Sequence, residues 1–253
     1  MTGLRPICEI MFADFLAVCW DGVANQIAKL RYMTDGQLEA PLVIRAANGG
    51  GVRFGAQHSQ TIESWAMAIP GLKVVAPSTP RDVLGLLAAT IRDPDPVLFF
   101  EHKALFSVQE DVPDTEHVDE LGKAAIRRDG KDVTLVSLAG MMRQTLQAAE
   151  ELSAKHGIEC TVIDLRSLVP LDTATILAAV RRTTRLVTIE ENPRLCGWGA
   201  EIVSIVADEA FFDLDAPVRR VTAPHIPLPF AAELEDAMLP SVDGIVTAVR
   251  SLQ

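Results

Sequence analysis

Apolar and polar positions along the chain change their period in a regular way. Short runs rich in β-branched residues occupy 6–11, 42–46, 73–76, 97–101, 133–138, 160–165, 185–190 and 218–222. Amphipathic stretches with helical spacing lie between them, at 15–33, 60–68, 80–92, 141–155, 172–182, 199–211 and 241–252. Strands that alternate with helices are typical of α/β proteins with mostly parallel sheets. The pattern therefore predicts an α/β fold with eight strands.

A stretch between the two halves of the chain breaks this pattern. From His102 to Asp132 the sequence turns to Pro, Asp, Glu and Lys without a sustained period, which is typical of a segment between domains. We predict two doubly wound domains, over residues 1–105 and 132–253, joined by a linker over 106–131. The second domain has enough strands and helices for a complete layer.

The first domain looks incomplete by itself. Its first strand begins at residue 6, so the sheet would keep an unpaired edge. The helix at 15–33 is apolar on much of its circumference and calls for burial on more than one side. We therefore expect either a fragment of a larger domain or an obligate oligomer in which a partner subunit covers this surface.

Charge and composition exclude several classes of protein. Among 253 residues, Lys and Arg number 23 and Asp and Glu 34, which gives a net charge of −11. No basic cluster is longer than a pair, so we expect no nucleic-acid partner. The sequence has neither a secretory leader nor 18 consecutive apolar residues, which predicts a cytoplasmic protein without a membrane span.

Four cysteines are too widely spaced for a zinc site or a disulfide framework. We expect reduced and mostly buried thiols at Cys8, Cys19, Cys160 and Cys196.

Candidate chemistry gathers after the second predicted strand. Three glycines at 49–51 free the backbone for close approach to a ligand, and ligands of open parallel sheets sit beyond the carboxyl ends of the strands. His58 follows on a loop ahead of a helix, where an imidazole can transfer a proton or hydrogen-bond a carboxylate. On these features alone, a histidine that caps the following helix is an equally good interpretation.

Six motifs at ordered positions carry a family resemblance: GLRPICEIM at 3–11, NQIAKLRYM at 25–33, QHSQ at 57–60, PGLKVVAP at 70–77, DLRSLVP at 164–170 and DAP at 215–217. The whole chain resembles the beta subunit of the thiamine-diphosphate-dependent 2-oxoacid dehydrogenase decarboxylase component, of the pyruvate or acetoin type. The resemblance implies a truncated pyrimidine-binding domain of the transketolase kind, followed by a transketolase C-terminal-type domain.

The resemblance also implies roles for individual residues. His58 matches the catalytic histidine that contacts the substrate carboxylate or the acyl intermediate. Phe15 matches the aromatic residue that packs on the aminopyrimidine ring of thiamine diphosphate, and Met11 lies beside it. For Phe15 and Met11, packing in the core is the alternative interpretation.

A structural potassium site is a further implication of the resemblance. It would use Leu42 and Val43 together with Thr90, Asp93 and Asp95, whose carbonyl and carboxylate oxygens are hard ligands. Capping of a helix C-terminus explains the segment at 90–95 nearly as well.

Two features of the family do not match this sequence. In the family the alpha subunit holds the diphosphate and magnesium through a Gly-Asp-Gly motif followed by an asparagine, and the chain has no such motif. Family members also carry, ahead of the GLRP motif, a segment with the glutamate that hydrogen-bonds the aminopyrimidine ring. We therefore expect a shortened beta subunit that is inactive alone.

The expected function is oxidative decarboxylation of a 2-oxoacid and acyl transfer to lipoyl groups. The expected partners are an alpha subunit, a second beta subunit and the lipoyl acyltransferase component. Three alternatives stay open: a truncated, non-catalytic assembly subunit; a beta subunit for acetoin or a branched-chain 2-oxoacid; and a transketolase-like sugar enzyme, which fits the motifs at 25–27 and 57–60 less well.

Overall fold

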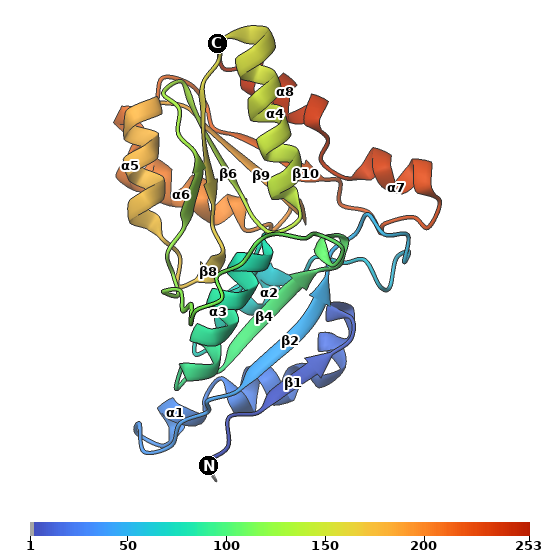
Figure 1. Ribbon diagram of the computed structural model, residues 1–253, viewed down its shortest axis with the longest axis vertical. Helices are drawn as coiled ribbons and strands as arrows, with labels where there is room; N and C mark the ends of the chain where they lie inside the picture. Colours follow the sequence, from blue (N-terminus) through green and yellow to red (C-terminus); the bar gives the residue numbers. More distant parts are fainter. Residues whose placement is uncertain (1–2) are drawn as a thin grey trace.

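The computed structural model describes residues 3–253 and contains two five-stranded sheets, one above the other in Figure 1. All but one of the strands in each sheet run parallel. The predicted α/β fold with two doubly wound layers is therefore confirmed.

The first sheet has the strand order β1-β2-β4-β3-β8. Its strands are β1 (Ile7–Ile10), β2 (Val43–Asn48), β3 (Lys73–Val75), β4 (Val97–His102) and β8 (Ser167–Val169). The central strand β4 is apolar over Val97–Phe100 and buried, as expected for a strand that is covered on both faces.

Helices cover both faces of this sheet. Helix α3 (Pro80–Arg92) packs its apolar side on Val75, Val97 and Phe99, while the opposite face lies under the segment 13–28 and α2 (Glu63–Met67). Pro80 occupies the first turn of α3, and the side chain of Thr79 accepts a hydrogen bond from the Asp82 backbone N–H. This cap begins the helix where the sequence predicts it.

The second sheet has the order β10-β9-β6-β7-β5. Its strands are β5 (Ala125–Arg128), β6 (Val133–Ser137), β7 (Cys160–Asp164), β9 (Leu186–Pro193) and β10 (Arg219–Ala223). Helices α4 (Met141–His156) and α8 (Val242–Arg250) contact one face, and α5 (Thr173–Thr183) and α6 (Gly199–Glu209) contact the other. A short helix, α7 (Ala232–Met238), projects to the side (Figure 1).

The prediction of one continuous helix over residues 15–33 is wrong. The segment forms a 3-10 helix η1 (Ala13–Cys19), a π-helical turn η2 (Gly22–Ile27) and one turn of α-helix, α1 (Leu30–Met33). Leu16 and Val23 enter the core, whereas Phe15 and Val18 stay exposed. Because the three turns differ in residues per turn, the buried stripe does not follow a single helical period.

The sequence pattern did not predict two short strands, β5 and β8. Each of them pairs with a strand from a distant part of the chain. Strand β8 belongs by sequence to the second half, yet it pairs antiparallel with β3 of the first sheet. Strand β5 lies within the expected linker and forms the antiparallel edge of the second sheet against β7.

Buried charges join the two sheets as well. Arg127 on β5 pairs with Asp82 at the start of α3 and, at 2.7 Å, with Asp164 at the end of β7. Asp164 is fully buried. Burial raises the pKa of Asp164, and the charge on Arg127 opposes that rise. Removal of one partner would leave an uncompensated charge in the interior.

Three of the four cysteines, Cys8, Cys19 and Cys196, are exposed, which corrects the expectation of mostly buried thiols; Cys160 alone is buried. All four are free thiols, as expected. None of the helices within residues 3–253 combines the length and the apolar character that a membrane crossing needs.

Candidate active site

The carboxyl ends of the parallel strands of the first sheet face the second sheet (Figure 1). Strands β2 and β4 end at Asn48 and His102, which are paired in register. Strand β9 of the second sheet brings Glu191 to the same place, where one of its oxygens lies 2.6 Å from His102 Nε2. The candidate site is thus at the edge where open parallel sheets bind ligands.

Four aromatic rings gather at this edge. The ring of His58 lies 4.7 Å from that of Phe12 and 5.3 Å from that of Phe15, centroid to centroid, and is nearly perpendicular to both. The ring of Phe54 packs against Phe12 at 5.4 Å. Edge-to-face packing of this kind fixes the direction of each ring. The structure therefore brings together His58 and Phe15, which the sequence predicted as site residues.

The loop around His58 shows why this histidine is not a helix cap. Helix α2 begins at Glu63, and its N-cap residue, Ile62, has no side-chain hydrogen bond at the cap. The start predicted at residue 60 is three residues too early. His58 is half-buried among the aromatic rings instead, so capping no longer explains its position.

Phe15 and Met11 are accessible at the surface. The exposed fraction is 44% for Phe15 and 77% for Met11. Packing in the core therefore does not account for either residue within this chain. Phe15 presents an accessible ring beside His58, which is the arrangement that stacking on a flat heterocycle needs. The binding roles of Phe15 and Met11 and the catalytic role of His58 stay predictions.

The glycine loop at 49–51 differs from the sequence interpretation. These glycines approach the protein itself, because a Cβ on Gly49 would lie 2.2 Å from His102 Nε2. The backbone N–H of Gly50 donates to Glu191 Oε1, and that of Gly51 donates to Glu235 Oε1 at 2.8 Å. The loop therefore packs against buried side chains of β4, β9 and α7.

His102 and Glu191 are both buried away from water. Burial lowers the pKa of His102, but the neighbouring Glu191 outweighs this effect, so the pKa of His102 is raised. Burial likewise acts to raise the pKa of Glu191, yet His102 and the Gly50 N–H hold it below its usual value. The two side chains form a buried ion pair between β4 and β9.

A second buried acid, Glu63, connects the two sheets through hydrogen bonds. It accepts hydrogen bonds from Asn48 Nδ2 at 2.6 Å and from Asn192 Nδ2 at 3.1 Å. Burial raises the pKa of Glu63, and the hydrogen bonds from its own backbone N–H and from Asn192 only partly offset the effect. Asn192 again belongs to the second sheet, so the site is anchored from both sheets.

Phe12 and Lys103 are the candidate residues that sequence reasoning missed. Phe12 precedes Phe15 by three residues, so the spacing of the two rings on one helical turn was a usable signal. Lys103 follows β4, and its Nζ atom lies 5.7 Å from the centroid of the Phe12 ring. Nothing in the local sequence marks this lysine as buried.

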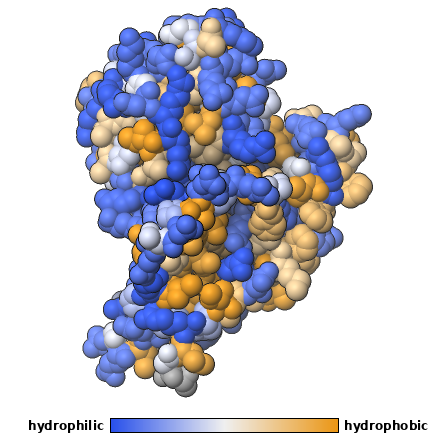
Figure 2. All heavy atoms as spheres, viewed as in Figure 1, coloured by the Kyte–Doolittle hydropathy of each residue, from blue (hydrophilic) through white to orange (hydrophobic). Residues whose placement is uncertain are grey.

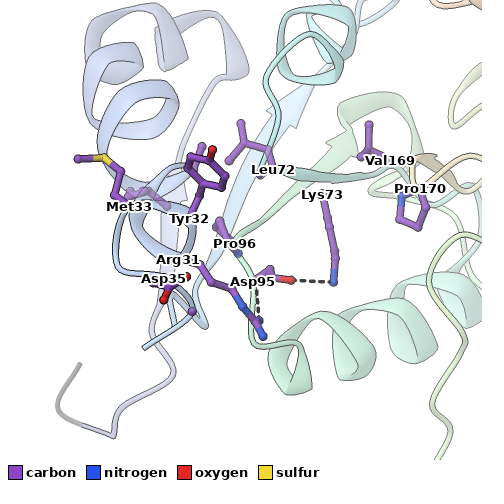
Figure 3. A pocket seen from close by; sticks show the side chains of 14 residues that line it. Arg31, Tyr32, Met33, Asp35, Leu72, Lys73, Asp95, Pro96, Val169 and Pro170 are labelled. Atoms are coloured by element: carbon purple, nitrogen blue, oxygen red, sulfur yellow. Dashed lines mark hydrogen bonds and ion pairs between the residues drawn. The ribbon is translucent and has the colours of Figure 1, made fainter. Parts of the chain in front are cut away.

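The residues of the predicted potassium site lie together, but their oxygens already have partners. Lys73 Nζ binds both carboxylate oxygens of Asp93, and Figure 3 shows Asp95 between Arg31 and Lys73 in a pocket of about 900 Å³. The carbonyl oxygens of Leu42 and Thr90 accept backbone hydrogen bonds. These contacts fit a potassium ion poorly, because two basic side chains take the same carboxylates.

Comparison with known proteins places this geometry in a family. The transketolase pyrimidine-binding domain family matches residues 1–109, and the transketolase C-terminal domain family matches residues 122–245. The chain is 48% identical, over 99% of its own length and 73% of the relative's, to the acetoin:2,6-dichlorophenolindophenol oxidoreductase subunit beta of Bacillus subtilis. The chain belongs to the family of transketolase-like dehydrogenase beta subunits. Another member of this beta-subunit family, the mitochondrial pyruvate dehydrogenase E1 component subunit beta-2 of Oryza sativa subsp. japonica, is 47% identical over 98% of this chain and 67% of the relative.

The fold of the beta-subunit family recurs in a solved structure described as a split gene transketolase, inactive beta4 tetramer. The two structures align with a TM-score of 0.80 at 24% identity, over 99% of this chain and 76% of the other. This likeness concerns the fold alone. It supports the fold class that the sequence predicted.

Proposed function

We propose that this chain is the beta subunit of a 2-oxoacid dehydrogenase decarboxylase of the pyruvate type. With an alpha subunit, it would decarboxylate a 2-oxoacid oxidatively and transfer the acyl group to lipoyl groups. The observation that carries the proposal is the contact of His58 with Phe12 and Phe15 at the carboxyl end of the first sheet, in a chain with the family's two domains.

Thiamine diphosphate is the cofactor that these residues fit. When bound, it supplies the electron sink that makes decarboxylation of a 2-oxoacid possible. Phe15 offers a half-exposed ring to the aminopyrimidine, and the side chain of Met11 is also exposed. The ring of Phe54 packs on that of Phe12, which in turn packs on His58.

His58 would act on the substrate near its reacting carbon, by proton transfer or by hydrogen bonding to a charged oxygen. Its imidazole is half-buried and fixed edge-on by two rings. A fixed imidazole can donate a hydrogen bond to the substrate carboxylate or to the acyl oxygen. It can also transfer a proton to or from the reacting group. A fixed orientation is what makes such a group effective in a transition state.

The surface around the site suits a protein partner. Phe15, Phe54 and Phe230 are exposed, and Phe230 lies 3.7 Å from the place where a Cβ on Gly55 would be. Hydrophobic atoms also gather over the lower half of the molecule in Figure 2, around the first sheet and α3. We infer that an alpha subunit and a second beta subunit cover these surfaces. The alpha subunit would bring the diphosphate and magnesium contacts, and the acyltransferase would receive the product.

Acetoin is the second candidate substrate. Two relatives at 48% identity carry acetoin in their names, one from Bacillus subtilis and one from Cupriavidus necator. The identity to the pyruvate dehydrogenase subunit is 47%, so sequence similarity does not separate the two substrates.

Reconstitution tests the proposal directly. The chain is assembled with its own alpha subunit, thiamine diphosphate and magnesium, and reduction of dichlorophenolindophenol is followed with pyruvate, acetoin or a branched-chain 2-oxoacid. We expect the highest kcat/KM with pyruvate. Faster turnover of acetoin would select the second candidate. An assembled complex that turns over none of the three would leave the assembly-subunit alternative and overturn the proposal.

A further inference from the structure

Asp14 connects the two segments that carry Phe15 and His58. It is buried in η1, although its neighbour Phe15 is half-exposed. One carboxylate oxygen, Oδ1, accepts two hydrogen bonds from Gln60, from the backbone N–H at 3.1 Å and from Nε2 at 3.0 Å. Gln60 follows His58 by two residues, so a single oxygen ties the His58 loop to η1.

The other hydrogen bonds of the His58 loop are longer and do not reach η1. The His58 N–H donates to the Gly55 carbonyl within the same loop at 3.4 Å, and the Gln60 carbonyl accepts from the Gly49 N–H at 3.3 Å. Within residues 3–253, the two bonds from Gln60 are the only ones that join residues 57–60 to η1. Bonds to an ionised acceptor are also roughly twice as strong as neutral ones. Asp14 is therefore the main link between the histidine and its aromatic neighbours, apart from ring packing.

Lys103 is a second buried charged residue, close to the Phe12 ring. Its Nζ atom is buried, lies 5.7 Å from the Phe12 ring centroid, and has no hydrogen-bond partner in the part of the chain that the structure describes. The second carboxylate oxygen of Asp14, Oδ2, is also buried and has no hydrogen-bond partner among the described residues. Burial lowers the pKa of Lys103, and Asp14 is foremost among the acids that oppose this effect.

We propose that Asp14 is a positioning residue, which holds His58 edge-on against Phe12 and Phe15 through its two hydrogen bonds from Gln60. The geometric part of this inference concerns the chain alone. Its kinetic part rests on the proposed function.

Three substitutions test the geometric part in the full chain. Asp14→Ala removes both acceptor oxygens, Asp14→Asn keeps one acceptor without the charge, and Gln60→Ala removes one donor from an exposed side chain. Asp21→Ala is the matched control, because Asp21 lies on the same helical segment and its Oδ1 accepts a hydrogen bond only from Asn25 Nδ2, at 2.7 Å.

The readout is the proton NMR spectrum of the histidine rings. The chain has five histidines, and loss of one signal in His58→Gln assigns the His58 Hε1 resonance. Ring currents of Phe12 and Phe15 displace this resonance, so it reports the packing itself. We expect Asp14→Ala to move it toward the position of a free histidine and to abolish its nuclear Overhauser contacts with Phe12. Asp14→Asn should shift it less, and Asp21→Ala should leave it in place.

The other four histidine signals separate a local effect from unfolding. In a local effect they keep their positions while the His58 signal moves. If Asp14→Ala does not fold, Gln60→Ala decides the question, because its backbone N–H still reaches Asp14 and a partial shift is expected. A His58 resonance that stays unmoved in the folded Asp14 or Gln60 variants would overturn the proposal.

The kinetic part is tested in the assembled complex. We expect Asp14→Ala to lower kcat about tenfold with little change in KM, because misplacement of a reacting group by even 1 Å costs turnover. In the double variant Asp14→Ala/His58→Ala, the loss should equal that of His58→Ala alone, since Asp14 acts through His58. Additive losses would contradict this role. If the complex has no activity at all, the proposed function fails while the NMR result still decides the geometry.

Discussion

His102 Nε2 lies 2.6 Å from a carboxylate oxygen of Glu191, and this contact joins the end of β4 in the first sheet to β9 in the second. Both side chains are buried. His102 also packs against Gly49 and Gly140, where a Cβ would come within 2.6 Å of its ring. A buried charge pair therefore connects the two sheets at the carboxyl end of β4.

Loss of this pair should destabilise the protein strongly. His102→Gln leaves the Glu191 carboxylate buried without its positive partner, and we expect the free energy of unfolding to fall by about 3 kcal/mol. Urea denaturation of the full chain measures the loss. The double variant His102→Gln/Glu191→Gln has no buried charge at this position and should recover at least half of it. A double variant as unstable as the single one would show that packing, rather than charge, governs the contact.

The same pair predicts how stability depends on pH. The pKa of His102 is raised above 6.5 in the folded chain, so its contribution is complete below about pH 6.5 and is lost as the pH rises through the raised pKa. The pKa of Glu191 is lowered below 4.5, so its contribution is complete above about pH 4.5 and is lost as the pH falls through the lowered pKa. The stability difference between wild type and His102→Gln should thus be largest between these limits. A difference that grows from pH 6.5 to 9 would contradict the assignment.

Gly49 should tolerate no side chain. Its φ is +85°, and a Cβ would meet the His102 ring at 2.2 Å. We expect Gly49→Ala to lower the free energy of unfolding by more than about 2 kcal/mol, from overpacking and backbone strain together. Gly36→Ala is the matched control, because Gly36 has a φ of +75° and no atom within 4 Å of its Cβ position. Equal losses in the two variants would mean that only the backbone matters at Gly49.

The isolated chain should bind thiamine diphosphate weakly. Residues 3–253 contain no group of three or more acidic, histidine or cysteine side chains placed to hold a metal ion, and metal and phosphate contacts carry much of the affinity for a charged cofactor. Calorimetric titration in the presence of magnesium should show a Kd above about 100 μM. A Kd near 1 μM would place a diphosphate site on this chain.

Strands with strong apolar runs could be predicted from the sequence, and short strands could not. Buried strands such as β6 and β4 have enough consecutive apolar residues to show their period. Strand β8 has three residues, and its partner β3 lies more than 90 residues earlier in the chain. A pairing over that distance depends on the tertiary fold and leaves no local signal.

Prediction of the site had a similar limit. The family resemblance singles out His58 and Phe15, and the structure places their rings 5.3 Å apart. Three consecutive glycines predict a ligand loop because glycine releases the backbone for any close neighbour, and here the neighbours are His102 and Glu191. Burial of Lys103 and Asp14 could not be foreseen, because charged residues are seldom buried and their partners lie in other segments.

Turnover and stability of His58→Ala, measured together in the complex with the alpha subunit, test the central claim most directly. A histidine that handles the substrate carboxylate or acyl group predicts a fall in kcat of about 10²-fold or more. The midpoint of thermal unfolding should barely change. The His58 ring is half-buried and forms no hydrogen bond within residues 3–253, and the backbone N–H of His58, which donates to Gly55, is kept in the variant. Unchanged turnover together with a loss of about 1 kcal/mol in stability would contradict the account and make His58 a packing residue.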